Sequence, residues 1–205
     1  MKNAKADCLG RAERISLFAV VADRARPGPG DQRLTRNNMT SHELFAAMPV
    51  SLASDIIEFS HTSDKKLYRA ALDAVAQARK VRPVFLERQP PAERNATIAG
   101  SLGRPALAIA ADTLIRNWLL KKHTTLLVDF LDALNIKHEQ GVVEDLPKSV
   151  EDAALKTAVE TLLAKHPAEA VSVYLHAFNS MNAESWANLD VLLQSEPRLR
   201  LTGKA

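Results

Sequence analysis

Two of the side chains best suited to chemistry are carboxylates in the longest stretch with sustained helical periodicity, residues 105–135. Asp129 and Asp132 are three positions apart, so a helix places them on one face, opposite its apolar residues. Such a pair can act as general acid and base where a cleft forms above it. A solvated helix face explains the same spacing more simply, so we take both as candidate binding residues and assign no catalytic residue.

Two histidines, His123 and His166, each end a predicted helix, directly after a lysine. A pair of equivalent histidines can bind a metal ion or transfer protons. At a helix end, however, histidine satisfies terminal carbonyl groups and, when protonated, interacts favourably with the helix dipole. We prefer this structural interpretation.

His138 precedes acidic residues in an irregular stretch, among them Glu139, Glu144 and Asp145. These side chains supply metal ligands only if the loop folds back on itself, and no HExxH motif accompanies them. We keep His138 as a candidate binding residue and predict neither a metal nor a cofactor.

Three bases, Arg116, Lys121 and Lys122, could line a basic strip, although acidic residues on adjoining turns dilute it. No glycine-rich phosphate loop is present after residue 38, where only four glycines occur. The aromatic residues of this part of the chain fall on apolar helix faces, which favours core packing over base stacking. We keep the three bases as candidate binding residues.

The composition favours helices. Alanine and leucine are abundant, whereas glycine occurs seven times and aromatic residues make up 5% of the 205 residues. This profile is typical of helices rather than sheets. With 46% hydrophobic residues, the chain is long enough for one well-buried core, and we predict an all-α protein.

Basic charge is concentrated at the N-terminus. Residues 1–38 carry eight basic and four acidic groups, a net +4, against +3 for the whole chain. Prolines and glycines follow its apolar part, so we expect 1–38 to be a flexible basic segment, and nucleic acid or an anionic membrane to bind only there. Thr40 to Glu43 fits a capping box, so we predict one all-α domain over 39–205 and hypothesise that Met39 is the physiological start.

The single cysteine, Cys8, excludes an intramolecular disulfide and a cysteine-based zinc site. No apolar run approaches the length of a spanning helix, and acidic residues precede the best signal-like stretch, 15–22. We therefore expect a cytoplasmic protein.

Prolines and capping residues divide the body into short helices. We predict helices over 41–48, 51–60, 64–81, 83–88, 91–102, 105–122, 124–135, 149–165, 167–181 and 182–196. Ser149 and Asp152 fit a second capping box, and the tail from Arg198 is expected to be mostly exposed. The longest irregular stretch is 136–148.

An internal similarity pairs residues 119–123 with 162–166, and 130–135 with 174–179. The period near 43 residues resembles that of HEAT or armadillo repeats in length and pattern, without a family signature. The prediction is therefore antiparallel helical hairpins that form a compact bundle or a short HEAT-like superhelix.

No motif names a reaction. The leading functional hypothesis is a non-catalytic module that binds another protein through a groove or an exposed helix face. Two alternatives remain: a small enzyme that uses Asp129, Asp132, His138 or His176, and attachment to nucleic acid or a membrane through residues 1–38. The oligomeric state is left open.

Overall fold

The computed structural model describes residues 39–141, 143, 145–182 and 186–201. The regular elements of this part of the chain are all helices, and it contains no extended strand. The predicted all-α class is confirmed. Residues 1–38, predicted to be a flexible basic segment, lie outside the described residues. The helices are Ser41–Ala47 (α2), Val50–Ser63 (α3), Lys65–Ala78 (α4), Pro83–Glu87 (α5), Pro91–Leu102 (α6), Ala108–Lys122 (α7), Thr124–Ala133 (α8), Asp152–Lys165 (α9), Ala168–Met181 (α10) and Ala187–Ser195 (α11), with 3-10 helices Pro105–Leu107 (η1) and Pro197–Leu199 (η2).

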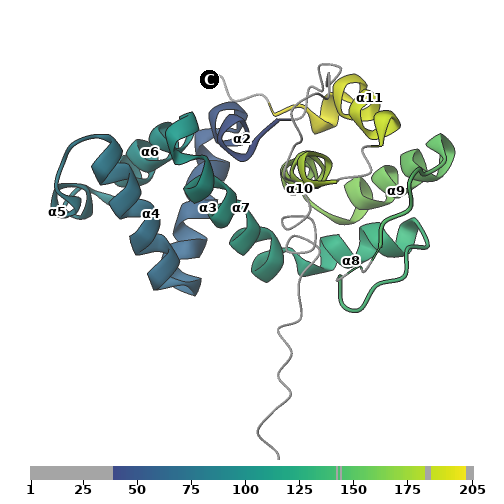
Figure 1. The fold of residues 1–205 in the computed structure, drawn as a ribbon, viewed down its shortest axis with the longest axis horizontal. Helices are drawn as coiled ribbons and strands as arrows, with labels where there is room; N and C mark the ends of the chain where they lie inside the picture. The colour runs from purple at the N-terminus through teal and green to yellow at the C-terminus, as the bar shows by residue number, and fades with distance from the viewer. Residues whose placement is uncertain (1–38, 142, 144, 183–185, 202–205) are drawn as a thin grey trace, which may run out of the picture.

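The helices form two lobes along the long axis of the molecule (Figure 1). In the N-terminal lobe, residues 39–123, α3 packs against α4, α6 and α7, and α2 packs against α6 and α7. In the C-terminal lobe, residues 124–201, α9 packs on α8, and α10 packs on α11 and η2. Contacts between α10 and α2 join the lobes, and one cluster of buried apolar residues extends through both.

Local capping explains where several helices begin. The predicted capping box is formed: the backbone N–H of Thr40 donates to Glu43 Oε2 at 2.7 Å, and α2 starts at the next residue. Asp64 caps α4, since its carboxylate accepts a hydrogen bond from the backbone N–H of Leu67 at 3.1 Å. These side chains satisfy backbone donors that a helix start leaves unpaired.

A Schellman arrangement ends α4. The backbone N–H of Val81 donates to the carbonyl of Ala76 at 2.9 Å, and that of Lys80 donates to Gln77 at 3.0 Å. This arrangement requires a left-handed residue, and Lys80 takes that role with φ 57°. Asn135 takes the same role after α8, with φ 54°.

The predicted central stretch forms much of the core. Trp118 of α7 and Phe130 of α8 are buried, and the ring of Phe130 lies 5.5 Å from that of Tyr174 and 5.3 Å from that of Phe178. The two helices meet at His123, as predicted, but α8 continues away from α7 into the other lobe (Figure 1). The stretch therefore connects the lobes.

One local prediction was wrong, the capping box at Ser149, because α9 begins at Asp152 and its N-cap is Glu151.

The tail from Arg198 was expected to be mostly exposed. Arg198 and Arg200 are exposed, but Leu199 between them is not. Leu199 has no exposed surface, and its carbonyl accepts a hydrogen bond from Ser172 Oγ of α10. Leu199 lies between two arginines, and this local pattern does not predict that it will be buried against α10.

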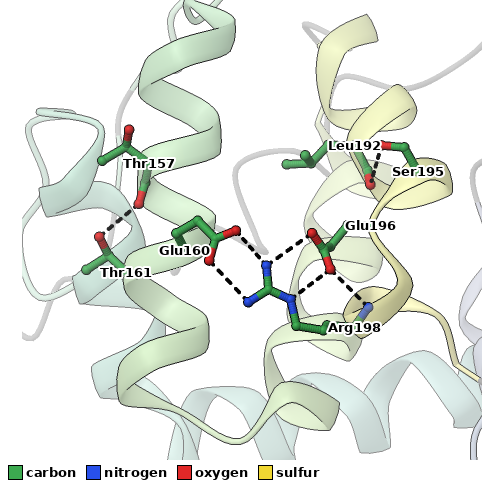
Figure 2. Close-up of polar contacts among 7 residues, drawn as sticks. All are labelled: Thr157, Glu160, Thr161, Leu192, Ser195, Glu196 and Arg198. Atoms are coloured by element: carbon green, nitrogen blue, oxygen red, sulfur yellow. Dashed lines mark hydrogen bonds and ion pairs between the residues drawn. The ribbon is translucent and has the colours of Figure 1, made fainter.

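An ion-pair cluster fixes this tail to α9 (Figure 2). The guanidinium of Arg198 lies between two carboxylates, Glu160 of α9 and Glu196, and donates to both. Hydrogen bonds from Arg198 lower the pKa of Glu196 to about 2. The segment that follows α11 is therefore part of the folded C-terminal lobe.

Candidate functional site

The two candidate carboxylates of α8 have different partners. His166, directly after α9, contacts Asp129 Oδ2 through Nε2 at 2.8 Å, and Lys165 contacts Oδ1 at 3.5 Å. The hydrogen bond from His166 lowers the pKa of Asp129. This pair joins α8 to the end of α9, so Asp129 has a structural partner that the sequence spacing did not indicate.

Asp132 contacts His138 instead. The backbone N–H of Gly141 donates to Nδ1 of His138 at 3.1 Å, which places the ring proton on Nε2. Nε2 lies 3.1 Å from Asp132 Oδ1 and donates to it. These two bonds hold the start of the irregular stretch against α8, where Gln140 and Gly141 both have positive φ.

The three candidate bases of α7 also meet carboxylates. Arg116 pairs with Asp112 at 2.7 Å, Lys121 reaches the α4 cap Asp64 at 3.3 Å, and Lys122 reaches Asp55 of α3 at 2.7 Å. The contacts of Lys121 and Lys122 therefore link α7 to its neighbours, whereas the Arg116 pair lies within α7. The basic strip considered from the sequence is interleaved with acidic groups.

A polar cluster surrounds Asp55 where α3 and α7 meet. Trp118 Nε1 donates to Asp55 Oδ2 at 2.9 Å, alongside the Lys122 contact. Burial raises the pKa of Asp55, but the hydrogen bonds from Lys122 and Trp118 outweigh burial and leave the pKa below its usual range. The ring of His123 lies 4.2 Å from that of Trp118, tilted by 58°, and burial lowers the pKa of His123.

His176, the fourth residue of the enzyme alternative, is buried in α10. It hydrogen-bonds to the backbone of Leu199, and burial lowers its pKa. No described contact links it to Asp129, Asp132 or His138. Within the residues that the structure describes, no three His, Cys, Asp or Glu side chains are grouped closely enough to hold a metal ion.

An open groove lies between the end of α8 and the start of α9, with a volume of about 560 Å³. Its apolar lining includes Leu134, Ile136, Leu146 and Ala154. Charged side chains in the lining are Lys137, Asp145 and Glu151. The groove could not be predicted from the sequence, because its lining residues, which follow α8 and lead into α9, come together only in the folded protein.

Charge is divided between the lobes. Residues 39–123 contain twelve basic and eight acidic groups, a net +4, whereas residues 124–205 contain seven basic and twelve acidic groups, a net −5. The nearly neutral sum for the body conceals this difference. Counting the charges separately before and after His123 reveals this difference from the sequence alone.

No known protein family, curated protein or solved structure matches the chain. Among the described helices, none alone has the length and hydropathy of a membrane span. The segments Pro91–Leu102 and Pro105–Lys122 reach those values only together, and they are bent by 105° where they meet.

Proposed function

We propose that this chain is a non-catalytic helical module that binds a segment of another protein in the groove between α8 and α9. The observation that carries the proposal is the groove itself, which is open and combines an apolar lining with acidic side chains. An open groove suits an extended or helical peptide better than a small molecule, which an enclosed pocket surrounds.

The charges favour a basic partner segment. Asp145 and Glu151 line the groove against the single lysine Lys137, and residues 124–205 carry a net −5. Complementary charge accelerates encounter and selects among partners, while apolar anchors supply most of the affinity. The expected partner segment therefore carries apolar side chains flanked by lysine or arginine.

The candidate carboxylates already contact other side chains, which supports a non-catalytic role. Asp129 and Asp132 lie against His166 and His138 respectively, and each histidine helps to join α8 to the segment that supplies it. A cytoplasmic location goes with the proposal, since the one cysteine, Cys8, cannot form an intramolecular disulfide in an oxidising compartment.

Adjacent alanines of α9 provide a matched test. Ala154 lines the groove, whereas Ala153 is exposed beside it and is not part of the lining. We expect affinity capture with the full chain to recover a recurring protein with the wild type and with Ala153→Arg. Ala154→Arg should reduce that recovery by about tenfold or more, because the arginine side chain would occupy space in the groove that the partner needs.

Circular dichroism and thermal unfolding of both variants check that neither arginine disturbs the fold. Equal recovery of the partner by Ala153→Arg and Ala154→Arg would place the interface elsewhere. If no protein recurs with the wild type, the proposed function is wrong.

A further inference from the structure

The corner formed by residues 79–88 exposes an unusual concentration of large apolar side chains. Val81, Val84 and Phe85 lie within five positions, and 59% of the Phe85 surface is exposed. Only Leu86 of the short helix α5 is buried. We call residues 79–88 the α5 corner. Figure 1 places α5 at the end of the long axis, away from the C-terminal lobe.

Basic residues surround these apolar side chains. The α5 corner contains Arg79, Lys80, Arg82 and Arg88 against the single acid Glu87, a net +3. Glu87 lies 3.9 Å from Arg69 of α4. Within the described part of the chain, Lys80, Arg82 and Arg88 have no ion-pair partner, in contrast to Lys121 and Lys122 of α7.

The backbone presents the corner in a fixed shape. The Schellman bond from Val81 to Ala76 ends α4, and Pro83 begins α5 directly afterwards. The buried side chain of Leu86 holds α5 against α4, and Pro90 and Pro91 follow it. Little backbone conformational entropy is therefore lost when the α5 corner meets a binding surface.

We propose that the α5 corner docks the protein on an anionic membrane surface. Phe85 and Val84 enter the boundary between headgroups and acyl chains, while Lys80, Arg82 and Arg88 contact lipid phosphates and carboxylates. Apolar insertion combined with basic side chains is how interfacial segments bind such surfaces. This attachment is separate from the peptide groove and from the basic residues 1–38.

Shape and chemistry favour lipid over an acidic protein. The α5 corner lies at the end of the long axis and its apolar side chains are exposed, while Lys80, Arg82 and Arg88 have no ion-pair partner in the described part of the chain. A layer of many equivalent anionic headgroups accepts such bases in any arrangement, whereas a protein interface usually fixes charged groups in specific pairs. At a membrane interface, apolar side chains reach the acyl chains while neighbouring bases stay at the level of the anionic headgroups. The α5 corner combines both kinds of side chain.

Vesicle sedimentation with the full chain tests the proposal. The wild type should pellet with vesicles of phosphatidylcholine and phosphatidylserine, and much less with phosphatidylcholine alone. Phe85→Ser, and separately Arg82→Gln with Arg88→Gln, should each reduce the partition coefficient by about tenfold. Added salt should weaken binding.

Matched controls lie in the same lobe. Ile109→Ser removes an apolar side chain that is 85% exposed on α7, and Lys65→Gln with Lys66→Gln removes two exposed bases of α4. Both should bind vesicles as the wild type does. Ala154→Arg should also bind normally, so failure of the groove proposal leaves this test intact.

Fluorescence reports insertion directly. Trp118 and Trp186 are buried, so the tryptophan of a Phe85→Trp variant would be the one exposed indole in the described part of the chain. Its emission should shift to shorter wavelength with anionic vesicles. No shift, equal binding to uncharged vesicles, or unchanged binding of the corner variants would overturn the proposal. So would the absence of vesicle binding together with a protein cross-linked to position 85, which would identify a protein as the occupant.

Discussion

At the scale of single residues, Lys80 holds a backbone conformation that lysine disfavours. Its φ of 57° is required by the Schellman bonds that end α4, and a side chain with a Cβ is strained there. We predict that Lys80→Gly stabilises the protein by about 0.5–1 kcal/mol, since the relief of strain exceeds the added entropy of the unfolded chain. Urea unfolding of the full chain measures the change.

Lys80→Ala separates conformation from charge. It removes the ammonium group but keeps the Cβ, so it should not gain the stability of the glycine variant. Both substitutions remove one base of the α5 corner and should weaken binding to anionic vesicles to a similar extent. Equal stability of the glycine and alanine variants would show that the left-handed backbone carries no strain.

Sequence patterns predicted which side chains are buried better than which ones pair. Periodicity places Trp118 and Phe130 on apolar faces, and both are buried. It gives no information on Lys122 meeting Asp55, 67 positions away, or His166 meeting Asp129, 37 positions away. Spacing defines a face of one helix, whereas these pairs depend on how separate helices pack.

At the scale of elements, the segment after α11 is short but packs against the C-terminal lobe. Leu199 of η2 is fully buried against α10, and Ser172 and His176 of that helix both hydrogen-bond to the backbone of Leu199. We predict that Leu199→Ala lowers the free energy of unfolding by about 2–5 kcal/mol, through lost apolar burial and the cavity that remains. Denaturant unfolding gives this value.

Val191→Ala is the control, because Val191 of α11 is 64% exposed and its truncation should change stability by less than about 0.5 kcal/mol. Hydrogen exchange should show faster opening of α10 in the Leu199 variant than in the control. A cost for Leu199→Ala no greater than that of the control would mean that the segment does not stabilise the lobe.

Helix positions were easier to predict than helix ends and partners. Prolines and the Thr40 capping box locate the early helices within a few residues, because these signals act locally. Ser149 also fits a capping pattern, yet it lines the groove instead, since the chain stays irregular until Glu151. The groove and the slot for Leu199 both arise from segments that meet only in the folded protein.

At the scale of the whole molecule, the two proposed surfaces differ in charge and position. The α5 corner is basic and lies at the end of the N-terminal lobe (Figure 1). The groove belongs to the acidic C-terminal lobe. An anionic membrane attracts the first and repels the second. Docking through α5 would therefore leave the groove directed away from the lipid and open to a partner protein.

The shifted ionisable groups make the fold as a whole sensitive to acid. Burial lowers the pKa of His123 and His176 below 6.5, so the unfolded chain takes up protons more readily as the pH falls through that value. The stability that these two neutral histidines contribute is complete above about pH 6.5 and is lost as the pH falls below that value. Asp129 and Glu196 act in the same direction below about pH 4.5, since their pKa values are also lowered by their partners.

Thermal unfolding across this pH range should therefore show a melting temperature that declines in two steps. His123→Gln removes one of the groups responsible for the first step, and His176→Gln removes the other. Each variant should have a shallower decline between about pH 7 and pH 5 than the wild type, whatever its stability at neutral pH. The second step should persist in both, because the carboxylates remain. A wild-type protein that becomes more stable between pH 7 and pH 5, or two variants that keep the full first step, would contradict the assignment of acid sensitivity to these buried histidines.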